Sequence, residues 1–253
     1  MQISIITITR NNAAGLRRTL ASVAAQSHAP IQHIIVDGCS SDGSDAVIAD
    51  YIKAQSSHGL NNSFSVITAT DNGSGVYNAI NTGLTMATGD VIGLLHAGDV
   101  YAGNDVLSRV AGEFDGEFDN GAVDFLYGDI HYGDASGRLY SGRRASARSL
   151  LRGFAPPHPS LFVRAAVQGQ VGLYKPDYVI GADFDMFVRL MAVGHYRGRY
   201  VPLDMVHMQP GGLASRWRHR LWTNNSERLR ALRENGLPAN ALRLLGRYFY
   251  FSK

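Results

Sequence analysis

Three aspartates each follow closely after an apolar, β-branched run of the kind that forms a buried strand. They are Asp37, Asp71 and Asp99. If these runs are neighbouring parallel strands, their carboxyl ends meet at one edge of the sheet, where open α/β sheets bind ligands. Carboxylate oxygens are ligands that Mg²⁺ and Mn²⁺ prefer, often together with substrate phosphates. The spacing predicts a metal ligand at Asp99 and a base or ribose contact at Asp37. A single such Asp is equally well a turn residue, and it is the set of three that favours a site.

Other polar or small residues gather at the same predicted strand ends. A glycine there lets the backbone approach a ligand closely. Asn78 and Asn81 are three residues apart, so they can share one face of a helix. Neither the glycine-rich dinucleotide fingerprint nor the phosphate-binding P-loop motif is present. The further candidates for donor binding are Thr9, Asn11, Ser40, Gly75, Asn78 and Asn81.

An alternation of strand and helix signals in the first third of the chain must position these residues. It predicts a mostly parallel sheet with helices on both faces, which is an α/β fold. After this alternation, the pattern predicts helices over Asn104–Phe114 and Asp183–Val193, and basic helical residues after Ser215. The predicted strands are Ile3–Thr9, Ile31–Val36, Phe64–Thr68, Val91–Leu95, Phe125–Tyr132, Arg138–Gly142 and Tyr196–Leu203.

The bulk properties fit one large globular domain. The chain has 253 residues, of which 45% are hydrophobic and 18% charged, enough for a substantial core. Its single cysteine, Cys39, excludes an intrachain disulfide. The start lacks the features of a signal peptide, and no apolar run reaches the roughly 18–20 residues that span a bilayer. We therefore predict a cytoplasmic protein, with a domain over residues 1–215 and a basic helical extension over residues 216–253.

Positive charge is concentrated in that extension. Residues 216–253 hold eight Arg and one Lys against two Glu, a net charge of +7, whereas the whole chain carries +3. This asymmetry predicts an anionic ligand or surface near the C-terminal end. Arg216 is a candidate for gripping a diphosphate. The tail is equally compatible with peripheral contact at the inner face of the plasma membrane, with a homodimer contact and with a solvated helix face. No nucleic-acid partner is predicted.

The motifs in combination resemble the family 2 glycosyltransferases of GT-A fold, and among these the bacterial enzymes of exopolysaccharide and O-antigen (colanic-acid-type) assembly. The resemblance runs from about Ile3 to Ser215. Ile34–Ser44 resembles the family's nucleoside-binding segment. Asp71–Gly83 resembles its D-x-G-I-Y-D-A-M-N-K-G segment, and Ala87–Asp90 resembles the stretch before its metal-binding strand.

The resemblance implies a Rossmann-like GT-A fold and a metal-dependent transfer. A sugar would pass from a nucleoside-diphosphate donor to a hydroxyl acceptor, a saccharide or a lipid-linked glycan, with inversion at the anomeric carbon. By the same resemblance Asp37 binds the donor base, Asp71 binds the nucleoside, and Asp99 holds Mg²⁺ or Mn²⁺ on the diphosphate.

The resemblance also suggests the residues of the acceptor side. Asp183, with Arg189 six residues later, matches the family's acidic residue and is predicted to be the catalytic base. Asp185 is the rival candidate for the base. Residues two apart on a helix face different directions, so at most one of the two aspartates points into the site. The alternative for Asp183 is a helix cap. His158 and His207 are additional candidates for contact with acceptor, phosphate or metal.

Two positions depart from the family pattern at the metal motif. Gly98 stands where many relatives have a first Asp, and His96 stands where Asn is common. A single carboxylate at Asp99 would then hold the ion together with phosphates and water, which suits Mg²⁺.

Two other functions are considered beside this one. A nucleotidyltransferase also pairs a metal carboxylate with a nucleotide-binding sheet, but its loop after the first strand is poorly matched by Arg10–Gly15. A non-catalytic sugar-nucleotide-binding partner of a polysaccharide-assembly complex is favoured by Gly98 and opposed by the intact Asp99 and Asp183.

Overall fold

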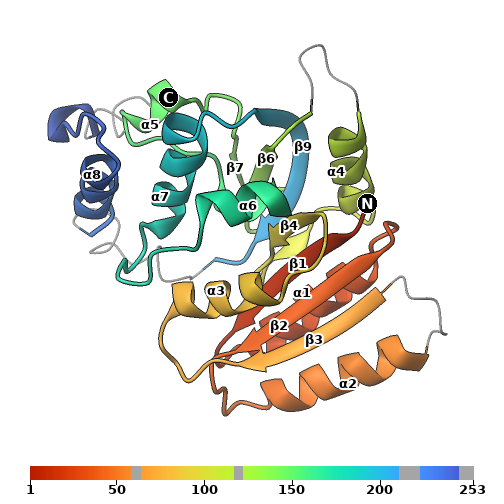
Figure 1. Ribbon diagram of the computed structural model, residues 1–253. Helices are drawn as coiled ribbons and strands as arrows, with labels where there is room; N and C mark the ends of the chain where they lie inside the picture. The colour runs from red at the N-terminus through yellow and green to blue at the C-terminus, as the bar shows by residue number, and fades with distance from the viewer. Residues whose placement is uncertain (58–63, 117–121, 211–222, 245–253) are drawn as a thin grey trace.

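The computed structural model describes residues 1–57, 64–116, 122–210 and 223–244. Within these ranges nine strands form one sheet, flanked by helices (Figure 1). The strand order is β3-β2-β1-β4-β8-β6-β9-β5, with β7 paired to β6. The strands are β1 (Ile3–Thr9), β2 (Ile31–Asp37), β3 (Phe64–Thr70), β4 (Val91–Leu94), β5 (Val100–Tyr101), β6 (Phe125–Tyr132), β7 (Arg138–Tyr140), β8 (Phe162–Arg164) and β9 (Gly198–Met208).

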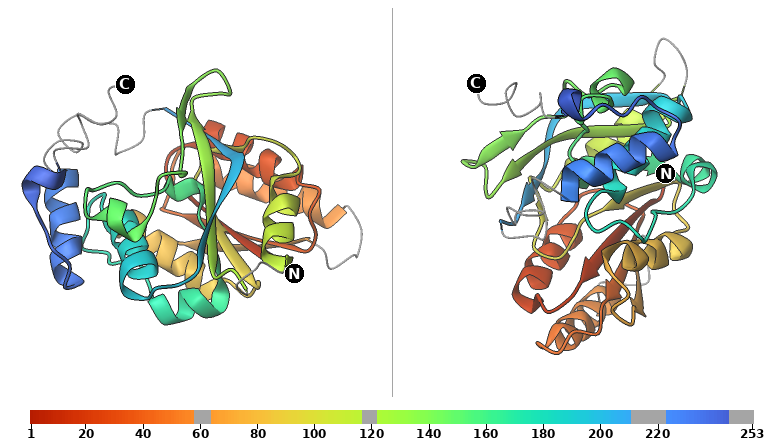
Figure 2. Two further views of the ribbon diagram at one scale, coloured as in Figure 1. Left: turned by 90° about the horizontal axis from the view of Figure 1, so that it is seen from above. Right: turned by 90° about the vertical axis from the view of Figure 1, so that its left-hand side faces the viewer.

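The helices lie on both faces of the sheet (Figure 2). Two of them are not α-helices: η1 is a single 3-10 turn and η2 is a short π-helix that continues α7. The helices are α1 (Ala13–Ala24), α2 (Ser44–Ser57), α3 (Val76–Met86), α4 (Val106–Asp115), α5 (Ala147–Leu150), η1 (His158–Ser160), α6 (Ala165–Val171), α7 (Ala182–Val188), η2 (Arg189–Val193) and α8 (Asn224–Glu234).

The first half of the chain forms four parallel strands, of which β1, β2 and β3 end level with one another. β1 pairs with β2 and β4, and β2 pairs with β3, all in parallel. The register places Thr9 beside Asp37 and Asp37 beside Thr70. β1 and β2 are buried on both faces, because α1 and α2 cover one face and α3 covers the other. The loops after β1, β2 and β3 are therefore neighbours.

The second half extends the sheet with antiparallel pairs. β8 runs antiparallel to both β4 and β6 and so joins the two halves. β6 and β9 are parallel, with shifts in register, and the short β5 pairs with the end of β9. On one face α4 packs into a core with β6 and β9, and on the other α6, α7 and α8 pack together. The mixed sheet confirms the predicted α/β class.

A buried carboxylate joins three segments of the second half. Asp185 of α7 is fully buried. Its Oδ1 accepts hydrogen bonds from Lys175 Nζ at 2.9 Å and Asn235 Nδ2 at 2.9 Å. Its Oδ2 pairs with Arg189 Nε at 2.8 Å. Arg189 also donates to the carbonyl oxygens of Val171 and Leu173. This network holds α7, the loop before it and the end of α8 together.

Asp185→Asn is expected to destabilise the protein. The substitution removes the carboxylate charge beside Arg189 and one of the two beside Lys175, which keeps Glu234 at 2.9 Å. The side chains of Lys175 and Arg189 are 32% and 14% exposed. Because both cations retain some contact with solvent, we expect a loss of about 3 kcal/mol in the free energy of unfolding, the low end for breaking a buried pair.

Urea unfolding of matched variants measures this loss. Asp177→Asn is the control, because the pair of Asp177 with Arg230 lies on the surface and is expected to contribute under about 1 kcal/mol. Equal losses in the two variants would contradict the assigned role of Asp185.

The sequence predictions located most strands, including the short β4 and β7, but missed several other short elements. The helix predicted over Asp183–Val193 is an α-helix as far as Val188 and continues as the π-helix η2. Phe125–Tyr132 has the predicted bounds, whereas the predicted strand over Tyr196–Leu203 is longer and ends at Met208. β5, β8 and α6 were not predicted. Their two to seven residues are too few to show a period.

The basic extension is partly described. Its helix α8 packs on α7, and Ala231 and Leu232 are buried in the core that α7 also joins. The predicted boundary between residues 215 and 216 lies outside the described residues, so the division into 1–215 and 216–253 stays a prediction. Among the described residues no helix is both long and apolar enough to cross a membrane.

Candidate functional site

A cleft opens where the parallel strands end. Its volume is about 560 Å³, and it lies at the loops after β1, β2, β3 and β4 and against the start of α7. The strand-end rule for open α/β sheets thus locates it correctly. Seven of the predicted site residues line it: Thr9, Asp71, Gly75, His96, Asp99, His158 and Asp183.

Asp99 is a buried carboxylate with one oxygen in use. Its residue is 7% exposed, and its Oδ1 accepts a hydrogen bond from the backbone N–H of Gln209 at 2.8 Å. Burial raises the pKa of Asp99 to about 7, opposed by that hydrogen bond and by the positive charge of Arg18. Among the described residues no hydrogen bond to Oδ2 is found. Oδ2 is therefore a carboxylate oxygen at the cleft with no partner among these residues. It fits one ligand of a Mg²⁺ or Mn²⁺ ion that keeps water and phosphate as its other ligands.

Gly98 has a backbone that other residues adopt poorly. Its φ is +110°, in a region that L-residues rarely occupy. A Cβ placed there would also lie 2.0 Å from the side-chain Oε1 of Gln209. The backbone of the loop at this position therefore has a conformation that favours glycine. An Asp at position 98 would be strained on this backbone, and the end of the Gln209 side chain would have to move.

Asp71 and its neighbours form the end of the cleft after β3. Asp71 is 9% exposed, and its Oδ1 accepts a hydrogen bond from Ser74 Oγ at 2.7 Å. Gly75 has a φ of +113° and immediately precedes α3. Arg10 crosses from the end of β1 to this loop, with its guanidinium 3.3 Å from the Cβ position of Gly73. Arg10 lines the cleft and supplies a positive charge there.

Three predicted donor ligands instead form a network among themselves. Ser40 donates to Asp37 through its backbone N–H at 3.0 Å and its Oγ at 2.5 Å. Ser40 Oγ also accepts from the N–H of Asn11, and Asn11 Oδ1 accepts from the N–H of Ser41. None of Asn11, Asp37 and Ser40 lines the cleft, although the adjacent Gly38 does. Their side chains fix the loop, and direct contact with a donor stays a prediction.

Asn78 and Asn81 face a second, shallower hollow between α3 and residues 173–176. Asn81 is clamped there, because its Nδ2 donates to the carbonyl of Tyr174 and its Oδ1 accepts from the N–H of the same residue. Asn78 donates to the carbonyl of Ser74. The shared helical face was predicted correctly, but it lies outside the main cleft.

Asp183 lies in the first turn of α7 and lines the cleft. Burial raises its pKa, opposed by the charge of Arg228 and by the N–H of Phe184, which donates to Oδ1 at 2.7 Å. The N-cap of α7 is Gly181, so Asp183 is not the cap. The side chain of Tyr77 supports this end of the helix by accepting a hydrogen bond from the N–H of Ala182.

The structure opposes the other predicted roles on this helix. Asp185 is absent from the cleft lining, and both of its oxygens are occupied in the buried network. Arg189 is occupied in the same network and with two carbonyl oxygens. A buried, fully paired carboxylate cannot reach an acceptor hydroxyl, so Asp185 is corrected from rival base to structural residue.

Two histidines on the cleft wall are uncharged near neutral pH. Burial lowers the pKa of His96 to about 3, with a further contribution from His158, and lowers the pKa of His158 to about 4. His158 Nε2 lies 2.8 Å from the hydroxyl of Tyr174. His96 Nδ1 is buried without a hydrogen-bond partner among the described residues. These side chains can exchange hydrogen bonds with a ligand but carry no charge to offset a phosphate.

His207 lies elsewhere. His207 does not line the cleft; its neighbour Met208 does. His207 Nε2 instead lies 3.0 Å from Asp204 Oδ2. Arg216 lies outside the described residues, so its contact with a diphosphate stays a prediction.

Sequence reasoning missed the residues that hold the far wall of the cleft. Val179 and Ile180 line it, and their backbone N–H groups donate to the carboxylate of Glu227 in α8, at 2.7 and 3.0 Å. Glu227 is 8% exposed. The signal was one of only two acidic residues in a basic segment, and the net charge alone did not show that it has a backbone partner.

Comparisons with known proteins agree with this arrangement. A family model described as glycosyl transferase family 2 matches residues 4–167. A PGL/p-HBAD biosynthesis glycosyltransferase of Mycobacterium bovis is 30% identical over 213 residues, which cover 84% of this chain and 78% of the relative. An uncharacterised glycosyltransferase of Mycobacterium tuberculosis is 31% identical over 196 residues, or 76% and 69% of the two chains. The chain therefore belongs to glycosyl transferase family 2.

Solved structures with the same fold have much lower sequence identity. S. aureus TarS 1–349, in complex with UDP-GlcNAc, superposes with a TM-score of 0.70 at 17% identity and covers all of this chain and 74% of that one. Glucosyl-3-phosphoglycerate synthase from Mycobacterium tuberculosis, in complex with Mn²⁺, UDP and its product, gives 0.62 at 13% identity, covering 94% and 81%. These similarities confirm the GT-A fold.

Gly98→Ala is expected to destabilise the protein. A side chain at a φ of +110° is strained, at a cost of order 1–3 kcal/mol. Gly112→Ala is the control, because Gly112 lies in α4 with nothing within 4 Å of an added Cβ, and Ala favours a helix by up to about 1 kcal/mol over Gly. Thermal or urea unfolding should therefore show opposite signs for the two variants, and a neutral Gly98→Ala would contradict the loop geometry.

Proposed function

We propose that this family 2 glycosyltransferase transfers a sugar from a nucleoside-diphosphate donor to a hydroxyl acceptor, with inversion and with a divalent cation. The observation that carries the proposal is the meeting of Asp99 and Asp183 in one cleft at the strand ends. One carboxylate comes from the loop after β4 and the other from α7. They therefore approach a bound donor from different parts of the chain.

The donor side is assigned to the loops after β1 and β3. Asp71 and Thr9 supply hydrogen-bonding groups for the nucleoside, and Gly75 leaves room for the close approach of a ligand to the backbone. Arg10 offers the diphosphate a positive charge. Asp37, Ser40 and Asn11 shape the loop behind them and, we propose, contribute to recognition of the base.

The cation is assigned to Asp99. Mg²⁺ or Mn²⁺ bound there would neutralise the charge that develops on the leaving diphosphate. The uncharged His96 stands beside it on the cleft wall, as either a hydrogen-bonding group or a neutral ligand.

Asp183 is assigned as the base. Its carboxylate takes the proton of the acceptor hydroxyl, and the acceptor oxygen forms a bond to the anomeric carbon. The bond from that carbon to the diphosphate oxygen breaks, and the nucleoside diphosphate leaves. Burial raises the pKa of Asp183, which makes it a stronger base than an exposed carboxylate.

The chemical class of the acceptor is a further part of the proposal. The relative from Mycobacterium bovis is named for glycosyl transfer in PGL/p-HBAD biosynthesis, which agrees with a saccharide or lipid-linked acceptor destined for the cell surface. The predicted membrane contact of the tail depends on residues 239–253, of which 245–253 lie outside the described residues. That contact, the cytoplasmic location and a dimer stay predictions.

Release of nucleoside diphosphate from a panel of sugar nucleotides tests the proposal. We expect slow release that requires Mn²⁺ or Mg²⁺, stops with EDTA, and falls about 10²- to 10⁴-fold in Asp183→Asn, the usual contribution of a general base. Asp99→Asn should raise the metal concentration required. Asp45→Asn is the control, since Asp45 is exposed on α2.

Two results would contradict the proposal. Donor binding without release in the presence of saccharide acceptors would favour a non-catalytic binding partner. Formation of pyrophosphate from a nucleoside triphosphate would favour a nucleotidyltransferase.

The rate should fall on the acid side of neutrality. Asp183 accepts a proton only when ionised, and burial places its pKa above the ordinary value of 3.8. The kcat/KM is therefore expected to decrease as the pH falls through a midpoint above 3.8, at metal concentrations that saturate Asp99. Asp183→Glu should move that midpoint while keeping partial activity. A wild-type profile that stays flat down to 3.8 would remove Asp183 as the base.

A further inference from the structure

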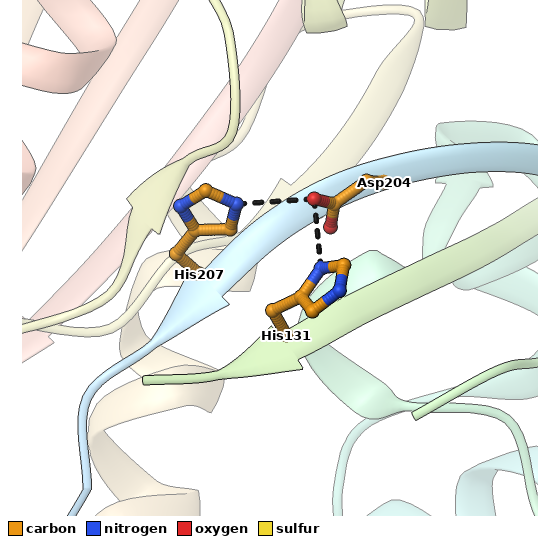
Figure 3. Close-up of side chains that lie close together, drawn as sticks. All are labelled: His131, Asp204 and His207. Atoms are coloured by element: carbon orange, nitrogen blue, oxygen red, sulfur yellow. Dashed lines mark hydrogen bonds and ion pairs between the residues drawn. The ribbon is translucent and has the colours of Figure 1, made fainter. Parts of the chain in front are cut away.

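Three side chains with metal-ligating atoms meet on strands β6 and β9, outside the cleft (Figure 3). His131 Nδ1 lies 2.8 Å from Asp204 Oδ2, and His207 Nε2 lies 3.0 Å from the same oxygen. The three ligand atoms are all within 4.8 Å of one another. His131 comes from β6, and the other two come from β9.

An irregularity in the sheet brings these side chains to one face. Asp129 is paired with Asp204, and the next residue, Ile130, is paired with Val206. Strand β9 therefore has one residue more than β6 in this stretch, a β-bulge. In a regular strand Asp204 and His207 would point to opposite faces, because they are three residues apart. The extra residue restores them to the face that His131 shares.

The group is separate from the cleft at Asp99. Met208 lines the cleft, whereas His131, Asp204 and His207 do not. Successive side chains of a strand point to opposite faces, so His207 points away from the cleft beside Met208. In addition, Val100 of β5 pairs with His207, so these two side chains lie on the same face of the sheet. Asp99 is next to Val100 and therefore points to the opposite face. An ion held by His207 here is therefore not the ion at Asp99.

One atom of the group lacks a partner. Asp204 Oδ1 is buried without a hydrogen bond among the described residues, although buried carboxylate oxygens are normally paired. The side chains are nevertheless open to small solutes, since His131 and His207 are 18% exposed and Asp204 is 31% exposed. A cation that this carboxylate binds through both oxygens would take Oδ2 from the histidines and give the unpaired Oδ1 a partner.

The donor set indicates the kind of ion. Imidazole nitrogens suit Zn²⁺, Ni²⁺ and Cu²⁺, whereas Mg²⁺ and Ca²⁺ prefer oxygen ligands. Two ligands of a tetrahedral zinc ion, each about 2.0 Å from it, lie about 3.3 Å apart. The two histidine–carboxylate distances of 2.8 and 3.0 Å are within a few tenths of an ångström of this spacing, and the ligand nitrogens of the two histidines lie within 4.8 Å of each other.

We propose that His131, Asp204 and His207 form a second metal site, which binds Zn²⁺ or a similar transition-metal ion with a fourth position open to water. The ion would link β6 to β9 next to the bulge. Its ligand His207 lies two residues before Gln209, whose backbone N–H donates a hydrogen bond to Asp99. The protein would thus carry two cations of different chemistry: a transition metal on the histidines and a hard cation at the donor.

Metal titration of the full, tag-free chain tests the site without any turnover assay. After removal of metals by chelation, Zn²⁺ is titrated in competition with a chromophoric chelator. We expect one Zn²⁺ per chain, not displaced by excess Mg²⁺. In His131→Gln and in Asp204→Asn the affinity should fall by more than about 100-fold, since even loss of an outer partner of a metal ligand costs about 10- to 100-fold.

Two control variants separate this site from other sources of binding. His195→Asn removes an exposed histidine from a position with positive φ that Asn tolerates, and Asp99→Asn alters the cleft carboxylate. Both should retain full stoichiometric Zn²⁺ binding. Circular dichroism of each variant checks that it is folded.

A spectroscopic measurement on the unaltered chain keeps the test independent of folding defects. Addition of Zn²⁺ should shift the imidazole NMR signals of His131 and His207 and leave that of His195 in place. The proposal is overturned if the wild type binds no stoichiometric Zn²⁺, if these signals do not move, or if binding survives His131→Gln and is lost in Asp99→Asn. None of these results depends on sugar transfer, so the proposed function and this site can fail separately.

Discussion

The buried carboxylate of Asp185 makes the interactions that position Asp183 and the side of the cleft that we propose to face the acceptor. It is paired with Lys175 and Arg189 and hydrogen-bonded to Asn235, and this fixes the rotation of α7 about its axis. Asp183 lies two residues earlier on the same helix and therefore faces another direction, into the cleft. Asp185 thus orients Asp183. The buried pair stabilises a particular geometry more than it adds net stability.

The cleft itself is assembled from two kinds of support. On the side that we propose for the donor, parallel strands bring the loops of Thr9, Asp71 and Asp99 together, and hydrogen bonds between loops hold them there. On the acceptor side no strand end performs this task. Instead Glu227 of α8 holds the backbone of Val179 and Ile180 by two charge-assisted hydrogen bonds. The proposed donor half is thus positioned mainly by strand pairing. The proposed acceptor half is positioned by hydrogen bonds to side chains.

The sequence predicted the parts of the molecule that follow from local periodicity. Strand ends were readable, so Asp71 and Asp99 were predicted there, and Asp183 was predicted from the family resemblance; all three line the cleft. The comparisons confirm the family and the GT-A fold. Side chains whose partners lie far away in the chain were not readable. Asp185 and Asn81 were predicted to be in the site, although long-range contacts occupy them. The group around Asp204 was missed because the register shift that creates it has no sequence signature.

The support from α8 has a consequence for the order in which the protein matures on the ribosome. The sheet strands that gather the donor loops are complete once residue 208 has been made, but the carboxylate that pins the acceptor wall comes later, at residue 227. The backbone N–H of Val179 is therefore made 48 residues before the carboxylate that holds it. The wall of the cleft that we propose to face the acceptor gains this support only once α8 has been synthesised.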